Sequence, residues 1–203
     1  MHLDILITYV FSSFLLTISP GPDILYIISQ SITRGKKTAI ITSFGLTTGL
    51  LFHTFFVIFG LSFFIKENEN IFLFLKIIGF FYFLYLALMV FLNRKNKIKL
   101  ELNKTKSFNS FKKGLLMNLI NPKVSIFFIA FFPGFVFNEN LNVEFQFLIL
   151  GLIFWFQANL IFIAVSIFSN KIKNLISSNN FFFRKKYIVE ICIYVFIGLW
   201  ILK

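Results

Sequence analysis

The sequence predicts an all-α integral membrane protein with six transmembrane helices. Three observations support this fold class: the composition, the length of the apolar runs and the placement of the basic residues. Of the 203 residues, 58% are hydrophobic and only 14% are charged, and the mean hydropathy is +0.84. A soluble domain is about half apolar and about one quarter charged. A chain embedded in lipid fits this composition better.

Six apolar runs are interpreted as bilayer-crossing segments, because a helix needs about 20 mostly apolar residues to cross the hydrocarbon core. The runs are continuous, whereas the strands of a membrane barrel alternate over about ten residues. We therefore expect helices at 5–32, 38–65, 71–92, 111–137, 143–169 and 187–202. The longest runs are predicted to tilt, break or project from the bilayer.

Most of the 20 Lys and Arg residues lie in the first, third and fifth connections between these runs. The second connection contains only Lys66, and the fourth contains none. Because cytoplasmic loops are rich in Lys and Arg, the odd-numbered connections are predicted to face the cytoplasm and both termini the outside. Topology also explains the net charge of +12, so nucleic-acid binding is not expected.

The long third connection divides the chain into two halves. We expect one transporter domain over 1–203, with a three-helix repeat at 1–92, a basic cytoplasmic loop at 93–112 and a second three-helix repeat at 113–203. Since each half has an odd number of spans, the second half enters the membrane upside down relative to the first. Inverted repeats of this kind are typical of secondary transporters.

The first and fourth runs each contain a proline followed by a charged residue. In "SPGPDILYIIS" these are Pro22 and Asp23, and in "NLINPKVSIFFIA" they are Pro122 and Lys123. Proline removes a backbone donor and clashes with the preceding helical turn, and Gly21 loosens the first site further. We therefore predict that helices 1 and 4 are broken or sharply kinked at these motifs.

Broken helices inside a membrane point to a binding site, because unwound backbone is tolerated only against protein or a water-filled cavity. A charge at the bilayer centre costs at least about 2.5–3.5 kcal/mol, so Asp23 and Lys123 are expected to pair or to face water. The alternative is a kinked pair of helices held together by a charge pair that binds nothing. The candidate substrate- or ion-binding residues are Pro20, Gly21, Pro22, Asp23, His53, Asn121, Pro122 and Lys123.

Two features of the second run have competing interpretations. His53 lies near its centre and is either a proton relay or substrate contact, or a hydrogen-bonded packing residue. Gly45 and Gly49 form a GxxxG motif, which mostly marks close packing of membrane helices. We assign this motif to packing.

The sequence lacks the motifs of an enzyme or a metal site. No HExxH, CxxC, Walker A or GxSxG appears, so we predict no enzyme activity, no cofactor and no metal, and transport would draw on an ion gradient. Cys192 is the single cysteine and is expected to be a small core residue. Lys76 and Glu190 lie near segment ends, where their side chains can reach the membrane interface.

Two stretches closely resemble signatures of the LysE/RhtB family of bacterial amino-acid exporters. The first is "TISPGPDILYIISQSITRGKKTAIITSFGLTTGLLFHTFFVIFGLS", and the second is "FKKGLLMNLINPKVSIFFIAFFPGFV". The resemblance covers nearly the whole chain and keeps the order and spacing of both motifs. It matches the proline motifs described above and places His53 where relatives often have histidine. Gly134 departs from the pattern, since many relatives have glutamine there.

The resemblance implies a multi-pass transporter of the bacterial inner membrane that exports amino acids or close derivatives by proton antiport and alternating access. Its partners would be an amino acid, protons, membrane lipids and, in a homodimer, a second copy of the chain. Neutral amino acids or the homoserine and threonine type are slightly favoured, because no second acidic residue is clearly placed to select a cationic side chain. Two alternatives are an ion or metal transporter of the wider LysE-type superfamily and a structural protein without a substrate.

Overall fold

The computed structural model describes residues 3–19, 21–61, 69–94, 107–138, 140–177 and 186–202, which are helical apart from short turns and connections. The all-α prediction is confirmed for these residues. In chain order the elements are α1 (Leu3–Ile18), α2 (Pro22–Arg34), α3 (Lys36–Phe56), the π-helix η1 (Val57–Leu61), α5 (Glu69–Leu92), α6 (Ser107–Ile120), α7 (Pro122–Ile126), the π-helix η2 (Phe127–Phe131), the 3₁₀ helix η3 (Phe132–Phe135), α8 (Val143–Ser177) and α10 (Lys186–Ile201).

Three helices are each long and apolar enough to cross a membrane: Lys36–Gly60, Leu73–Leu92 and Val143–Ser169. Two bent helix pairs bring this number to five if each pair is counted as one span. A shorter apolar helix follows at Tyr187–Ile201. Each of the six apolar runs expected from the sequence therefore contains an apolar helix, and the last helix is the short one.

The two bent pairs lie at the proline motifs. Leu3–Ile18 and Pro22–Arg34 meet at 53°, and Asn109–Ile120 and Pro122–Phe135 meet at 50°. The predicted breaks in the first and fourth runs are confirmed. In each pair the second helix begins at a proline.

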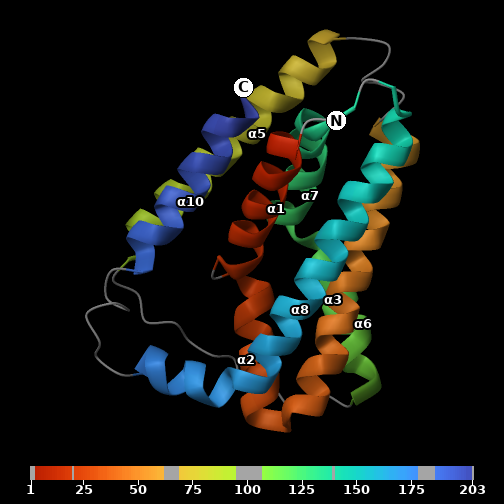
Figure 1. Ribbon diagram of the computed structural model, residues 1–203. Coiled ribbons are helices and arrows are strands. Elements are labelled where there is room, and N and C mark those ends of the chain that lie inside the picture. The colour runs from red at the N-terminus through yellow and green to blue at the C-terminus, as the bar shows by residue number, and fades with distance from the viewer. Residues whose placement is uncertain are drawn as a thin grey trace.

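Figure 1 shows α1 between two groups of helices, with α5 and α10 on one side and α3, α6 and α8 on the other. Helices α3 and α6 pack along much of their length. A Cβ atom added to Gly45 on α3 would overlap the backbone carbonyl of Phe111 on α6, and one added to Gly114 would overlap the carbonyl of Thr42. The glycines thus let the two backbones touch, which confirms the packing role predicted for the GxxxG motif.

Large apolar side chains cover much of the outer surface. Ile7, Phe59 and Phe81 are exposed over 68%, 79% and 62% of their areas, and they lie on three different helices. Soluble monomers rarely expose extended apolar patches. This surface is the one expected of helices that contact lipid.

Three expectations from the sequence need correction. Helix α6 begins at Ser107, inside the connection expected at 93–112, and α8 continues to Ser177, beyond the run expected at 143–169. Cys192 is exposed rather than a core residue, because an apolar run does not distinguish a lipid-facing position from a buried one. Lys66 and residues 95–106 lie outside the described residues.

Candidate functional site

The first break is a short non-helical link between α1 and α2. Ser19 ends α1 with a hydrogen bond from its backbone N–H to the carbonyl of Leu15 at 3.0 Å, and Pro20 lies outside the described residues. Gly21 is the extended N-cap residue of α2, and Pro22 takes its first helical position. Proline suits this position because the first N–H groups of a helix have no partner inside it. Asp23 follows in the first turn.

At the second break, a side chain accepts a hydrogen bond from one of the unpaired N–H groups at the helix start. Asn121 is the N-cap residue of α7, and its Oδ1 accepts a hydrogen bond from the backbone N–H of Lys123 at 3.1 Å. Pro122 occupies the first helical position. A capped helix start explains why the chain can end α6 and begin α7 with no intervening loop.

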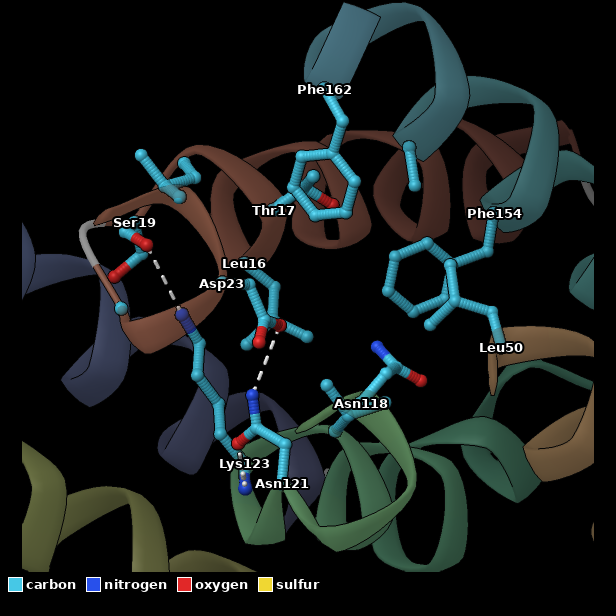
Figure 2. A pocket seen from close by; sticks show the side chains of 14 residues that line it. Leu16, Thr17, Ser19, Asp23, Leu50, Asn118, Asn121, Lys123, Phe154 and Phe162 are labelled. Carbon is cyan, nitrogen blue, oxygen red and sulfur yellow. Dashed lines mark hydrogen bonds between the residues drawn. The ribbon is translucent and has the colours of Figure 1, made fainter. Parts of the chain in front are cut away.

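Two hydrogen bonds join the breaks across the molecule (Figure 2). The Nδ2 of Asn121 donates to the Oδ2 of Asp23 at 3.0 Å. The Nζ of Lys123 donates to the carbonyl oxygen of Ser19 at 3.3 Å. The side chains of Asp23 and Lys123 thus each form a hydrogen bond to the opposite break. Lys123 is only 8% exposed.

Helix α10, in the C-terminal part of the chain, also reaches this site. Ser19 Oγ donates to the hydroxyl of Tyr194 at 3.0 Å, and that hydroxyl lies 3.5 Å from Oε1 of Glu190. The Nζ of Lys123 lies 5.4 Å from the centre of the Tyr194 ring. Glu190 is 8% exposed, so its expected position at the membrane interface is wrong. Its helix, α10, packs against α5 and α1, which places the carboxylate inside the bundle.

A cavity of about 30 Å³ lies between the two breaks. Its polar side contains Ser19, Gly21, Asp23, Asn121 and Lys123. A cavity of this size holds one or two water molecules, since one water needs about 10–15 Å³. An amino acid needs more room, so the site must widen before it can hold one.

The opposite wall of the cavity is apolar. Leu50 on α3 and Phe154 and Phe162 on α8 face the polar side, as Figure 2 shows, and Leu16 on α1 adds apolar surface beside Asp23. The site therefore offers charged and polar groups on one side and an aliphatic and aromatic surface on the other. Such a combination suits a small amphiphilic ligand.

Two acceptor atoms at the cavity have no hydrogen-bond partner among the described residues. They are Oδ1 of Asp23 and Oδ1 of Asn118, and both are buried. Both residues line the cavity. A buried acceptor without a donor is destabilised by about 1–3 kcal/mol, so a ligand that brings a donor would bind favourably here.

His53 lies beside this site and does not line the cavity formed by the described residues. Its Nε2 is 3.3 Å from the carbonyl oxygen of Asn118, and its ring stacks on Phe128 with the centres 5.4 Å apart. Asn118 precedes the second break by one helical turn. His53 can therefore affect the site through Asn118.

Comparison with known proteins identifies the family. The family description "LysE type translocator" matches residues 14–201. The chain belongs to the LysE family. No solved structure matches it.

Three LysE-type relatives illustrate the range of similarity. The chain is 30% identical to the uncharacterized membrane protein YrhP of Bacillus subtilis over 169 residues, which are 78% of this chain and 80% of that protein. It is 33% identical to a homoserine/homoserine lactone efflux protein of Salmonella typhimurium, over 70% of this chain and 69% of that protein. It is 28% identical to a leucine efflux protein of Salmonella choleraesuis, over 64% of this chain and 62% of that protein.

Sequence reasoning missed several residues of the site in this LysE protein. Asn118 carries a weak signal, as a polar residue three positions before the second break. Tyr194 and Glu190 are distant in the chain and follow no motif. The apolar lining residues Leu50 and Phe154 resemble every other apolar residue in their helices, so only the packing of the fold identifies them.

Proposed function

We propose that this LysE-type translocator exports amino acids and that the cavity between the two breaks is its substrate site. The observation that carries the proposal is the convergence of Asp23 and Lys123 on one cavity with an apolar wall. A zwitterion needs a negative group for its ammonium and a positive group for its carboxylate. Each broken span supplies one of them.

The roles of the residues follow from their positions. The unpartnered Oδ1 of Asp23 can accept a hydrogen bond from the substrate ammonium. Lys123 can attract the substrate carboxylate, and the N-terminus of α2 adds a partial positive charge beside it. Asn121 holds Asp23 in place through Nδ2. The backbone at Gly21 and the prolines Pro20, Pro22 and Pro122 would shape the breaks.

The substrate class is suggested by the wall opposite the charges. Leu16, Leu50, Phe154 and Phe162 favour an aliphatic or otherwise uncharged side chain. The efflux proteins for leucine and for homoserine named among the relatives fit the same class. We therefore favour neutral amino acids and homoserine-like molecules.

The transport cycle would use alternating access across two inverted three-helix repeats, 1–92 and 113–203, that together give six spans. Helix α2 runs from the first break toward one end of the molecule, and α7 runs from the second break toward the other (Figure 1). This opposition supports the inverted arrangement. The basic connections favour a bacterial inner-membrane orientation with both termini outside.

Proton antiport would couple the cycle to the membrane gradient. Asp23 is the best candidate for the coupling residue, because it can hold either a proton or the substrate ammonium. His53 is a second candidate, acting through the Asn118 carbonyl at 3.3 Å. Because a proton and the substrate ammonium would compete for Asp23, binding of one would accompany release of the other.

An efflux assay tests the proposal. Cells that produce the protein are loaded with labelled leucine or homoserine, and loss of label is followed with and without a protonophore. We expect faster efflux than in cells with an empty vector, and we expect the protonophore to remove the difference. If no amino acid is exported and the cells instead gain tolerance to metal salts, the metal-transporter alternative replaces this proposal.

A further inference from the structure

A second and larger cavity lies at the end of the molecule where both termini are found (Figure 1). Its volume is about 300 Å³, which reaches the range of small-ligand pockets. Four segments enclose it: the start of α1, the first part of α5, the η2–η3 region and the end of α10. The site between the breaks does not share any of its lining residues.

The lining of this outer cavity combines both charges with aromatic surface. Asp4 and Thr8 come from α1, Lys76 from α5, and Phe131 and Trp200 from η2 and α10. The carboxylate and the ammonium group thus belong to different helices. A molecule with one positive and one negative group and a short apolar portion matches this set.

A layer of aromatic rings separates the outer cavity from the site between the breaks. Phe154 lines the inner site, and its ring centre is 5.4 Å from that of Phe127. The Phe127 ring is 4.5 Å from Phe131, which lines the outer cavity. Tyr9 packs against the same layer, 6.4 Å from Phe127. These packed rings are the barrier that a substrate would cross between the two cavities.

We propose that the outer cavity is a second binding site for amino acids, which receives the substrate released from the inner site before it leaves the protein. The proposal rests on the function proposed above, since it assigns the same substrate class to a second position. Asp4 would bind the ammonium group and Lys76 the carboxylate. Phe131 and Trp200 would contact the side chain.

Gly134 provides a way to fill this cavity without disturbing its walls. It lines the cavity, and a Cβ atom added to it would meet no heavy atom within 4 Å. Gly60, in η1, is a matched control outside the cavity, because an added Cβ there meets only the Phe56 ring at 3.8 Å, an ordinary contact. A large side chain at 134 should block the outer site, while one at 60 should leave both sites intact.

The test measures equilibrium binding of radiolabelled leucine to the purified protein in nanodiscs of phosphatidylethanolamine and phosphatidylglycerol. We expect two equivalents per chain in the unmodified protein and in Gly60→Trp, and one in Gly134→Trp. Lys76→Met should weaken binding at the outer site by about tenfold or more, because it removes a charge-assisted contact. Lys123→Ala should remove the other equivalent.

Several outcomes would overturn the proposal. A single equivalent in the unmodified protein that Gly134→Trp does not affect would contradict the outer site while leaving export intact. Mass spectrometry that finds phospholipid retained by the unmodified protein and lost in Gly134→Trp would assign the cavity to a lipid headgroup instead. Failure of the function itself looks different, because neither leucine nor homoserine would then bind at either site or be exported. Gly134→Gln provides a second, smaller blocking variant if the tryptophan variant does not fold.

Discussion

The break between α1 and α2 and the break between α6 and α7 both start a helix at a proline, but they differ in how their polar groups are satisfied. Asn121 caps the second break with its own side chain, whereas Gly21 at the first break has no side-chain cap. The first break instead accepts two hydrogen bonds from the second, from Lys123 to Ser19 and from Asn121 to Asp23, and Ser19 also bonds Tyr194 on α10. The second break therefore caps its own helix, whereas the first is held by groups from other parts of the chain.

Helix α2, which follows the first break, also contains buried polar groups without partners among the described residues. Gln30 is fully buried on this helix, and neither atom of its amide has a hydrogen-bond partner among the described residues. Oδ1 of Asp23, at the other end of α2, is also unpartnered. Unsatisfied buried groups make a conformation less stable, so displacement of α2 would relieve part of the cost of this arrangement.

The largest effect is expected when either of the charged side chains that link the two breaks is replaced. Lys123→Ala removes the donor to the Ser19 carbonyl and the positive charge near Asp23, and Asp23→Asn removes the negative one. Each change should reduce efflux of labelled leucine to the level of cells without the protein, since each charged contact is worth about 1.5–3 kcal/mol. Lys112→Ala, at an exposed lysine on the same helix as the second break, should export normally. Normal export by either site variant, with normal amounts in the membrane, contradicts the account.

Changes at Asn121 separate its capping role from its bridging role. Asn121→Asp keeps an oxygen for the N–H of Lys123 but has no Nδ2 to donate to Asp23. We expect export to fall about tenfold or more. Asn121→Ala loses both roles and should also lower the free energy of unfolding by about 1 kcal/mol. Thermal melting and efflux are measured together, with the exposed Asn93→Ala as control. Equal efflux from Asn121→Asp and the unmodified protein would show that the bridge to Asp23 has no function.

Replacement of the buried amide on α2 should raise stability and slow transport. Gln30→Leu removes two unsatisfied polar atoms at similar size, which should raise the free energy of unfolding by about 1–3 kcal/mol. Because the arrangement described here gains this stability relative to the others in the transport cycle, the efflux rate should drop several-fold. A variant that melts at a lower temperature would indicate that the amide has partners in the membrane, and the proposed mobility of α2 would then lose its support.

The smallest effect is expected at the first break itself. A Cβ atom added to Gly21 would lie 3.5 Å from Nζ of Lys123 and 3.7 Å from the carbonyl oxygen of Ser19, both ordinary contacts. Gly21→Ala should therefore change the free energy of unfolding and the free-energy barrier to efflux each by less than about 0.5 kcal/mol. Gly49→Ala is the contrasting variant, because its added Cβ would overlap the Asn118 side chain. The extended conformation of residue 21 seen here does not require glycine. If Gly21→Ala abolished export without destabilising the protein, another step of transport would require a backbone conformation that only glycine adopts.

The breaks and the helices could be predicted from sequence because their signals are local. A proline inside an apolar run, next to an asparagine or glycine, dictates a new helix start wherever the rest of the chain lies. The placement of the basic residues predicts the number and the orientation of the spans. Many of the contacts around the cavity could not be predicted from local sequence in this way. The contact between Asn121 and Asp23 joins residues 98 positions apart, and the Tyr194 hydroxyl reaches Ser19 over 175 positions.

Glu190 illustrates the limit best. Its place near the start of the last apolar run suggested a side chain that reaches the membrane interface, yet it lies buried beside Tyr194. Only the position of α10 in the bundle decides between these environments. The two π-helices η1 and η2 had no recognisable signal either, since their apolar sequences also suit an ordinary α-helix.

The central claim is that both breaks face one cavity that binds substrate and opens to each side of the membrane in turn. Thr17 lines this cavity, so a Thr17→Cys variant in a Cys192→Ser background places a single thiol there. A membrane-impermeant maleimide is applied to one side or the other of oriented vesicles, with and without leucine. We expect labelling from both sides and protection by leucine in both cases. Labelling from one side only, or labelling that leucine does not change, would contradict it.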